Sequence, residues 1–310
     1  MATTAAPPVP WNLLQRAEER TAPLRALYPY EPHFHAVGEE HLHYVDEGPR
    51  EAAPVLCVHG NPSWSFLYRG LVAELSPSRR VIAPDHLGCG LSSTPRDYAY
   101  TLERRVDDLS SLVEALDLRE IDLVVHDWGG PIGLSVAARM PERFRRLVVT
   151  NTAAFRSTKI PLRIAACRVP LFGRLAVQGL NGFARAATTM AVERPLSPEV
   201  KRGYLAPYSN WSERRATHEF VRDIPMRAGD RSWDALLVLE SSLERLADKP
   251  ALLVWGARDW CFHTGYLDEW RRRWPHAEVR VAEDAGHYLF EDAPERVLPW
   301  IEDFLERSQA

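Results

Sequence analysis

Short runs of apolar residues recur along the chain and alternate with segments whose apolar residues share one helical face. There are eight such runs between residues 33 and 287, and those in the middle, such as PVLCV (54–58) and LVV (123–125), are continuously apolar. Continuous apolar runs are typical of strands buried on both faces. Between two runs, residues 102, 106, 109, 112, 113 and 116 are apolar, which is helical spacing. The alternation predicts an α/β fold with helices on both sides of a mostly parallel sheet.

The alternation stops between residues 156 and 234, where several short helical patterns are broken by proline and glycine. The strand pattern resumes near Lys249. This arrangement predicts one α/β core formed by residues 30–155 and 235–310, with a helical cap inserted at residues 156–234. Residues 1–29 are rich in alanine, proline and charge, and they are expected to form an N-terminal extension with room for one short helix.

Composition excludes several classes of protein. The 310 residues are 45% hydrophobic and 26% charged, which is typical of a globular protein, and a net charge of −4 gives no reason to expect nucleic acid. The four cysteines have no paired spacing, so we expect neither a zinc site nor a disulfide framework. The first residues, MATTAAPPVPW, lack the pattern of a signal peptide, and no apolar run is long enough to span a membrane. We therefore expect a cytoplasmic protein.

Polar motifs follow five of the predicted strands, at the point where each strand ends. Since the carboxyl ends of parallel strands meet at one edge of a sheet, motifs at those ends are candidates for a shared site. The five motifs are VHGNP (58–62), PDHLGCGLS (84–92), HDWGG (126–130), VWGARDW (254–260) and EDAGHYLFED (283–292).

The chemistry of these motifs is that of a carboxylate nucleophile. Asp127 stands where a strand turns sharply into a helix, and a carboxylate can attack an alkyl carbon to form an ester without a base. His287, oriented by Asp259, could then activate water to hydrolyse that ester. The backbone N–H groups of Asn61 and Trp128 are candidates for an oxyanion hole, and their side-chain N–H groups could hold a leaving anion.

Each of these residues also has a structural interpretation: Asp127 as a helix cap, His287 as a surface residue, Asp259 as a loop carboxylate, and Asn61 and Trp128 as packing residues. We favour the catalytic interpretation because all five occur together at predicted strand ends. Two other functions remain open. One is a binding module built on the same fold. The other is an ester hydrolase, although such an enzyme normally has serine at the turn.

The order Asp127, Asp259, His287 is the order of nucleophile, acid and base in α/β hydrolases. Residues 30–307 resemble the haloalkane dehalogenase branch of that family, on the motifs HGNPSW, PDHLGCGLS and HDWGG. The resemblance implies an α/β-hydrolase fold with an eight-stranded, mostly parallel sheet. It also implies a catalytic triad of these three residues, a halide held by Asn61 and Trp128, and no cofactor or metal.

Stretches outside the catalytic motifs narrow the resemblance to the third subgroup of the branch, and within it to the β-lactone decarboxylases of bacterial olefin biosynthesis. These stretches are VVTNTAAF (148–155), GLNGFARAAT (179–188), residues 204–233 and EDAGHYLFED (283–292). The resemblance implies decarboxylation of a cis-3-alkyl-4-alkyloxetan-2-one, a small apolar substrate, to a cis-olefin and CO2. Haloalkane dehalogenation is the alternative.

Two further alternatives concern epoxide hydrolases and the position of the acid. Epoxide hydrolases share HDWGG, but they usually have an aromatic residue where this chain has Asn61, and they need tyrosines from the cap, here Tyr204 or Tyr208. Some relatives place the acid after the preceding strand, where this chain has Asn151, which is not a carboxylate. That difference favours Asp259 as the acid.

Three expectations concern surfaces and partners. The resemblance implies association with other enzymes of the olefin pathway and with the membrane surface, and it leaves the oligomeric state open. The basic, apolar stretch 160–186 is either a cap helix over the pocket, which we favour, or a membrane-surface helix. His41 and His43 alternate along a predicted strand, where we favour a solvated strand face over a pair of metal ligands.

Overall fold

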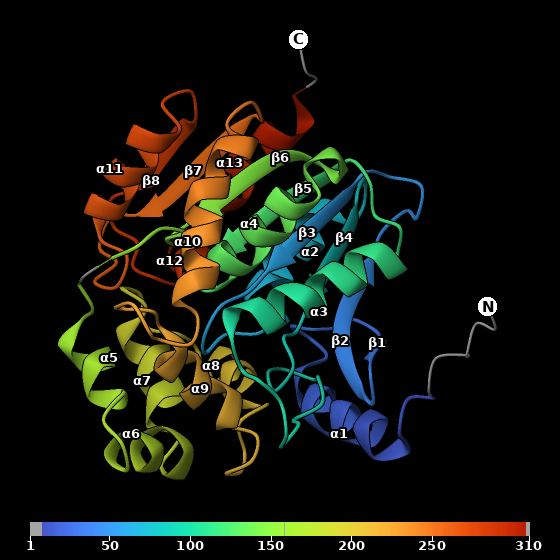
Figure 1. Ribbon diagram of the computed structural model, residues 1–310. Helices are drawn as coiled ribbons and strands as arrows, with labels where there is room; N and C mark the ends of the chain where they lie inside the picture. The colour runs from blue at the N-terminus through green and yellow to red at the C-terminus, as the bar shows by residue number, and fades with distance from the viewer. Residues whose placement is uncertain (1–7, 158, 308–310) are drawn as a thin grey trace, which may run out of the picture.

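An eight-stranded sheet forms the centre of the molecule in a computed structural model that describes residues 8–157 and 159–307 (Figure 1). Residues 1–7 of the expected extension lie outside the described residues. The strands are β1 (His33–Val37), β2 (Glu40–Glu47), β3 (Pro54–Val58), β4 (Arg80–Pro84), β5 (Ile121–His126), β6 (Phe144–Thr150), β7 (Ala251–Gly256) and β8 (Glu278–Ala282).

The strand order is β1-β2-β4-β3-β5-β6-β7-β8. Strands β1 and β2 and the pair β2 and β4 are antiparallel, and every other pair is parallel. All residues of β3, β5 and β7 are buried, as their continuous apolar patterns predict. The predicted α/β fold with an eight-stranded, mostly parallel sheet is confirmed.

Helices cover both faces of the sheet and divide the core into two layers. One layer packs against α3, α4, α10 and α11, and the other packs against α1, α2, α12 and α13. Helix α3 begins where the Thr101 side chain accepts a hydrogen bond from the backbone of Arg104, which caps the free N–H groups of the first turn. These helices are α1 (Trp11–Thr21), α2 (Arg69–Leu75), α3 (Leu102–Ala115), α4 (Gly129–Arg139), α10 (Trp233–Ser242), α11 (Thr264–Arg273), α12 (Leu289–Asp292) and α13 (Pro294–Glu306).

Between β6 and α10 the described chain forms short helices that gather at one end of the molecule (Figure 1). They are short because Pro161 and Pro170 interrupt the helical pattern and because Leu171 and Asn181 adopt positive φ. The segments are α5 (Leu162–Cys167), α6 (Phe172–Arg174), the π-helix η4 (Leu175–Gly179), α7 (Gly182–Met190), α8 (Pro198–Leu205) and α9 (Arg215–Asp223). The remaining short helices are η1 (Ala22–Leu24), η2 (Ser65–Tyr68), η3 (Pro141–Arg143) and η5 (Leu243–Leu246).

A buried ion pair joins these short helices to the sheet domain. Arg69 of α2 donates two parallel hydrogen bonds to Glu291 of α12, at 2.5 and 2.8 Å. The hydroxyl of Tyr204, on α8, donates to the same carboxylate at 2.6 Å. All three side chains are largely buried, so their mutual pairing fixes α8 against the core.

The expectation of a solvated strand face at His41 and His43 is wrong, because both side chains are buried in β2. The imidazole of His43 lies 2.8 Å from a carboxylate oxygen of Asp85, which also accepts hydrogen bonds from the backbone of Ser65 and Leu91. This network ties β2 to the loop after β4. Within the described residues, no three His, Cys, Asp or Glu side chains are grouped to hold a metal ion.

Candidate active site

The turn between β5 and α4 places Asp127 at its apex. Asp127 has φ of 51°, in the left-handed region, so its side chain projects from a sharp bend between the strand and the helix. The glycines of HDWGG are required by close packing: a Cβ on Gly129 would lie 1.8 Å from the carbonyl oxygen of Val58. A Cβ on Gly130 would lie 2.0 Å from the Thr152 hydroxyl. The motif therefore encodes a tight strand–turn–helix joint.

The carboxylate of Asp127 is buried against the loop that follows β3. Its Oδ1 atom accepts a hydrogen bond of 2.6 Å from the backbone N–H of Asn61. Gly60 makes this approach possible, because a Cβ there would lie 2.0 Å from the same oxygen. Burial raises the pKa of Asp127, and the nearby His287 and the backbone N–H groups of Asn61 and Trp128 oppose that rise. A partly desolvated carboxylate of raised pKa is a stronger nucleophile than one in water.

His287 lies between the two carboxylates that the sequence singles out. Its Nδ1 is 2.8 Å from Oδ2 of Asp259, and its Nε2 is 3.8 Å from Oδ2 of Asp127. The first distance is a hydrogen bond; the second is too long for one, so Nε2 faces the carboxylate and stays open to a ligand or water. Burial alone would lower the pKa of His287, but the charge and hydrogen bond of Asp259 raise it above its ordinary value.

Asp259 is held by three donors. Besides His287, the backbone N–H of Cys261 donates to Oδ1 at 2.6 Å, and the Asn151 amide donates to Oδ2 at 2.8 Å. Burial would raise the pKa of Asp259, yet the charge and hydrogen bond of His287 hold it below its ordinary value. The buried Asp259 is therefore an ionised acceptor that fixes the Nδ1–H tautomer of His287.

Two supporting residues were not identified from the sequence as part of the site. Asn151 stands at the strand end where some relatives have an acid, and here it hydrogen-bonds the acid instead. His126, beside the nucleophile, has an Nε2 2.8 Å from the carbonyl oxygen of His287, and burial together with that charged neighbour lowers its pKa to about 3. His126 is the first residue of HDWGG and Asn151 lies within VVTNTAAF, but nothing in the sequence shows which way their side chains point.

Asn61 and Trp128 line the same cavity as Asp127 and His287. One N–H of the Asn61 amide donates to the carbonyl oxygen of Thr217 in α9 at 3.2 Å, which leaves its second N–H for a ligand. The indole of Trp128 packs on Phe220, with ring centroids 5.3 Å apart, and its N–H donates to no described residue. Both side chains therefore offer an N–H donor to a ligand in the cavity.

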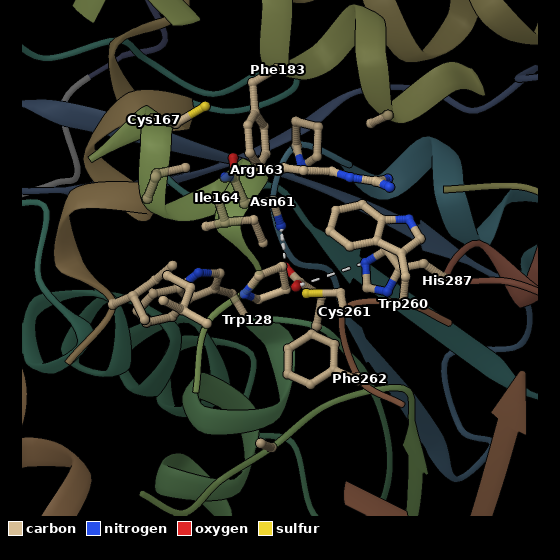
Figure 2. A pocket seen from close by; sticks show the side chains of 18 of the residues that line it. Asn61, Trp128, Arg163, Ile164, Cys167, Phe183, Trp260, Cys261, Phe262 and His287 are labelled. Atoms are coloured by element: carbon tan, nitrogen blue, oxygen red, sulfur yellow. Dashed lines mark hydrogen bonds and ion pairs between the residues drawn. The ribbon is translucent and has the colours of Figure 1, made fainter. Parts of the chain in front are cut away.

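The cavity above Asp127 has a volume of about 460 Å³ and is almost entirely apolar (Figure 2). Its walls come mainly from the short helices, and Figure 2 shows Ile164 and Phe183 near the side opposite Phe262. Asp127, His287, Asn61 and Trp128 lie together at one side of the cavity, and Figure 2 shows Arg163 on the side of Phe183. Such a cavity fits an apolar ligand whose one reactive polar group rests on the nucleophile.

Tyr204 and Tyr208, the two tyrosines considered for an epoxide hydrolase, do not line this cavity. The hydroxyl of Tyr204 donates to Glu291, and that of Tyr208 donates to the carbonyl oxygen of Ser63 at 3.4 Å. Burial raises the pKa of both phenols. Neither group is placed to protonate an epoxide oxygen above Asp127.

Comparison with known proteins identifies the family of the chain. A family model described as the alpha/beta hydrolase fold matches residues 53–294. The cis-3-alkyl-4-alkyloxetan-2-one decarboxylase of Shewanella oneidensis is 44% identical, over 92% of each chain. Haloalkane dehalogenase 2 of Mycobacterium bovis is 32% identical, over 89% of this chain and 95% of the other.

Solved structures agree at the level of the fold. The crystal structure of haloalkane dehalogenase DbeA from Bradyrhizobium elkani superposes with a TM-score of 0.80 at 28% identity, covering 90% of this chain and 99% of the other. The sequence similarity, the structural similarity and the family model all extend over most of the chain. This chain belongs to the α/β-hydrolase family.

Proposed function

We propose that this protein decarboxylates cis-3-alkyl-4-alkyloxetan-2-ones to cis-olefins and CO2, with Asp127 as nucleophile and His287 and Asp259 as its base and acid partners. The observation that carries the proposal is the buried Asp127 carboxylate at one side of a mostly apolar cavity. The relative that shares 44% of its residues bears this activity in its name, whereas the dehalogenase shares 32%.

A reaction that balances without water begins with attack of Asp127 on ring carbon 4. A bond forms from Oδ2 to that carbon, the bond to the ring oxygen breaks, and its electron pair remains on the oxygen as a carboxylate. Asn61 and Trp128 would bind this carboxylate as they would bind a departing halide. Loss of CO2 then supplies the electron pair of the new double bond, while the ester bond breaks and its pair returns to Asp127.

The stereochemistry of this route agrees with the product. Attack from the side opposite the ring oxygen inverts carbon 4. The new ester bond can then lie antiperiplanar to the bond between carbon 3 and the carboxylate, which breaks when CO2 leaves. Inversion followed by anti elimination keeps the two alkyl chains on the same side. A cis-lactone therefore gives a cis-olefin, and Asp127 is restored as a free carboxylate.

Haloalkane dehalogenation is the second candidate, and the position of His287 favours it as a side activity. The alkyl ester formed from a haloalkane has no neighbouring carboxylate to expel, so it must be hydrolysed. The open Nε2 of His287, 3.8 Å from Oδ2 of Asp127, is placed to activate a water for that step. The first chemical step is the same in both reactions.

One experiment tests the proposal and its route together. Wild type and Asp127→Asn are given a long-chain cis-lactone labelled with ¹⁸O at the ring oxygen, and olefin and CO2 are analysed by gas chromatography and mass spectrometry. We expect olefin from wild type alone, with both lactone oxygens in the CO2. Label remaining on the enzyme or on an alcohol would refute attack at the ring carbon. Halide release from 1-iodohexane without any olefin would make the protein a dehalogenase.

A further inference from the structure

The segment that forms α5 to α7 has an unusual charge pattern. From residue 152 to residue 192 the sequence contains no aspartate or glutamate, although the whole chain carries a net charge of −4. The same segment contains six basic residues: Arg156, Lys159, Arg163, Arg168, Arg174 and Arg185. No described carboxylate forms an ion pair with Arg163, Arg174 or Arg185, and all three residues are exposed, although the guanidinium of Arg163 also stacks on Trp260 at the cavity wall.

The same segment carries most of the large apolar side chains that are exposed. Of the eleven such residues described, seven lie between residues 162 and 190, and Leu162 and Leu171 are 87% and 82% exposed. An eighth, Trp211, packs beneath the guanidinium of Arg174, whose carbon lies 5.2 Å from a ring centroid. The seven are Leu162, Val169, Leu171, Phe172, Leu175, Leu180 and Met190. A concentration of this kind marks an interaction surface rather than scattered exposure.

This surface adjoins the cavity. Phe172 and Met190 are both exposed and part of the cavity lining, so the exposed apolar residues reach the rim of the pocket. Figure 1 places α5, α6 and α7 at the outer end of the molecule, away from the sheet. We call the exposed apolar residues of this segment, together with Arg163, Arg174 and Arg185, the apolar cap face.

We infer that the apolar cap face docks on the surface of an anionic lipid bilayer. Exposed leucine and phenylalanine side chains flanked by arginines are the combination that binds the boundary between headgroups and acyl chains. The uniformly positive charge favours anionic headgroups, and it disfavours pairing of this face with a second copy of itself. No helix of the described part of the chain is long and apolar enough to cross the bilayer.

Docking of this kind would have a consequence for the substrate. Because the rim of the cavity belongs to the apolar cap face, a lipid-dissolved alkyl chain could pass from the acyl region into the cavity without crossing water. This consequence rests on the proposed function, whereas docking itself does not.

The test is co-sedimentation with vesicles, which needs no substrate. Wild-type protein is mixed with vesicles of phosphatidylcholine, with or without phosphatidylglycerol, and the bound fraction is measured at low and high salt. We expect binding at least about tenfold stronger to the anionic vesicles, falling as salt screens the charges. Leu162→Gln/Leu171→Gln/Leu180→Gln should weaken binding about tenfold or more, and Arg174→Gln/Arg185→Gln should remove the preference for anionic lipid.

The matched control changes three exposed apolar residues outside the face: Trp11→Gln/Leu14→Gln/Val238→Gln. It should bind within about twofold of wild type, because surface binding scales with the apolar area of the docking face. The altered residues of the face lie outside the cavity lining, so all variants should turn over a short-chain, water-soluble substrate as wild type does. Equal loss in the control, no wild-type binding, or self-association through this face in gel filtration would overturn the inference. A wild type that binds vesicles yet makes no olefin would refute the proposed function alone.

Discussion

Replacing Asp259 by asparagine should separate the two reactions that the site can perform. Oδ2 of Asp259 accepts from His287 and from Asn151, both at 2.8 Å, and Oδ1 accepts from Cys261 at 2.6 Å. An amide offers one oxygen to these three donors, so its NH₂ group must face a donor. His287 relieves the conflict by taking the other tautomer, with its proton on Nε2, toward Asp127. In that form it cannot accept a proton from water.

The expected loss can be estimated from the tautomer argument. An equivalent change in a serine protease lowers turnover about 10⁴-fold, so we expect hydrolytic turnover of 1-iodohexane to fall about 10³- to 10⁴-fold, or about 4–5.5 kcal/mol. The first turnover should survive as a burst of halide, because Asp127 attacks without a base. Olefin formation from a cis-lactone should fall less than about tenfold, since the proposed route transfers no proton.

The assay is a stopped-flow measurement of halide beside gas chromatography of olefin, on wild type and Asp259→Asn. Asp284→Asn is the matched control, because Asp284 is an exposed carboxylate paired with Arg296 and Arg194. Equal losses in both reactions would refute the reasoning, since they would give His287 the same role in each. An unchanged halide turnover would remove Asp259 from the site altogether.

Three further predictions follow from the same contacts. Halide turnover should decline as pH falls through the pKa of His287, because Asp259 raises that pKa and the protonated imidazole cannot act as a base. Olefin formation should persist until the pH nears the pKa of Asp127. Profiles of both reactions against pH test this difference. Glu291→Gln should lower the free energy of unfolding in urea by about 3 kcal/mol because it leaves the largely buried Arg69 without its charge partner, and a loss under about 1 kcal/mol would contradict it. Gly60→Ala, whose Cβ would lie 2.0 Å from Oδ1 of Asp127, should reduce both activities about 100-fold or more while circular dichroism stays native.

Much of the core could be predicted because its signals are local. Buried parallel strands need apolar residues at every position, and all eight apolar runs became strands of the sheet. The parallel order then brings strand ends together, which is why Asp127, Asp259 and His287 meet although 160 residues separate the first from the last. The turn at Asp127 is encoded by adjacent glycines, whose missing Cβ atoms leave room for the joint.

The features that escaped prediction depend on partners far away in the sequence. The alternating pattern around His43 is typical of a surface strand. Its buried partner, Asp85, follows the neighbouring strand β4 and is 42 residues away in the sequence. The link between Arg69, Glu291 and Tyr204 joins three elements with no periodic signal in common. Asn151 could be excluded as the acid by its chemistry, yet its contact with the acid depends on how two strand ends are aligned.

The residues around Asp127 do not by themselves choose between decarboxylation and dehalogenation. In the proposed routes both substrates pass through an ester of Asp127, and both release an anion toward Asn61 and Trp128. What differs is the fate of that ester: a neighbouring carboxylate can leave as CO2 within the same molecule, whereas a simple alkyl ester must wait for water and His287. Because loss of CO2 from the Asp127 ester requires no collision with water, the ester formed from a lactone should decarboxylate before it can be hydrolysed. Selection between the reactions therefore falls to the helices that shape the cavity walls and decide which substrate reaches the nucleophile.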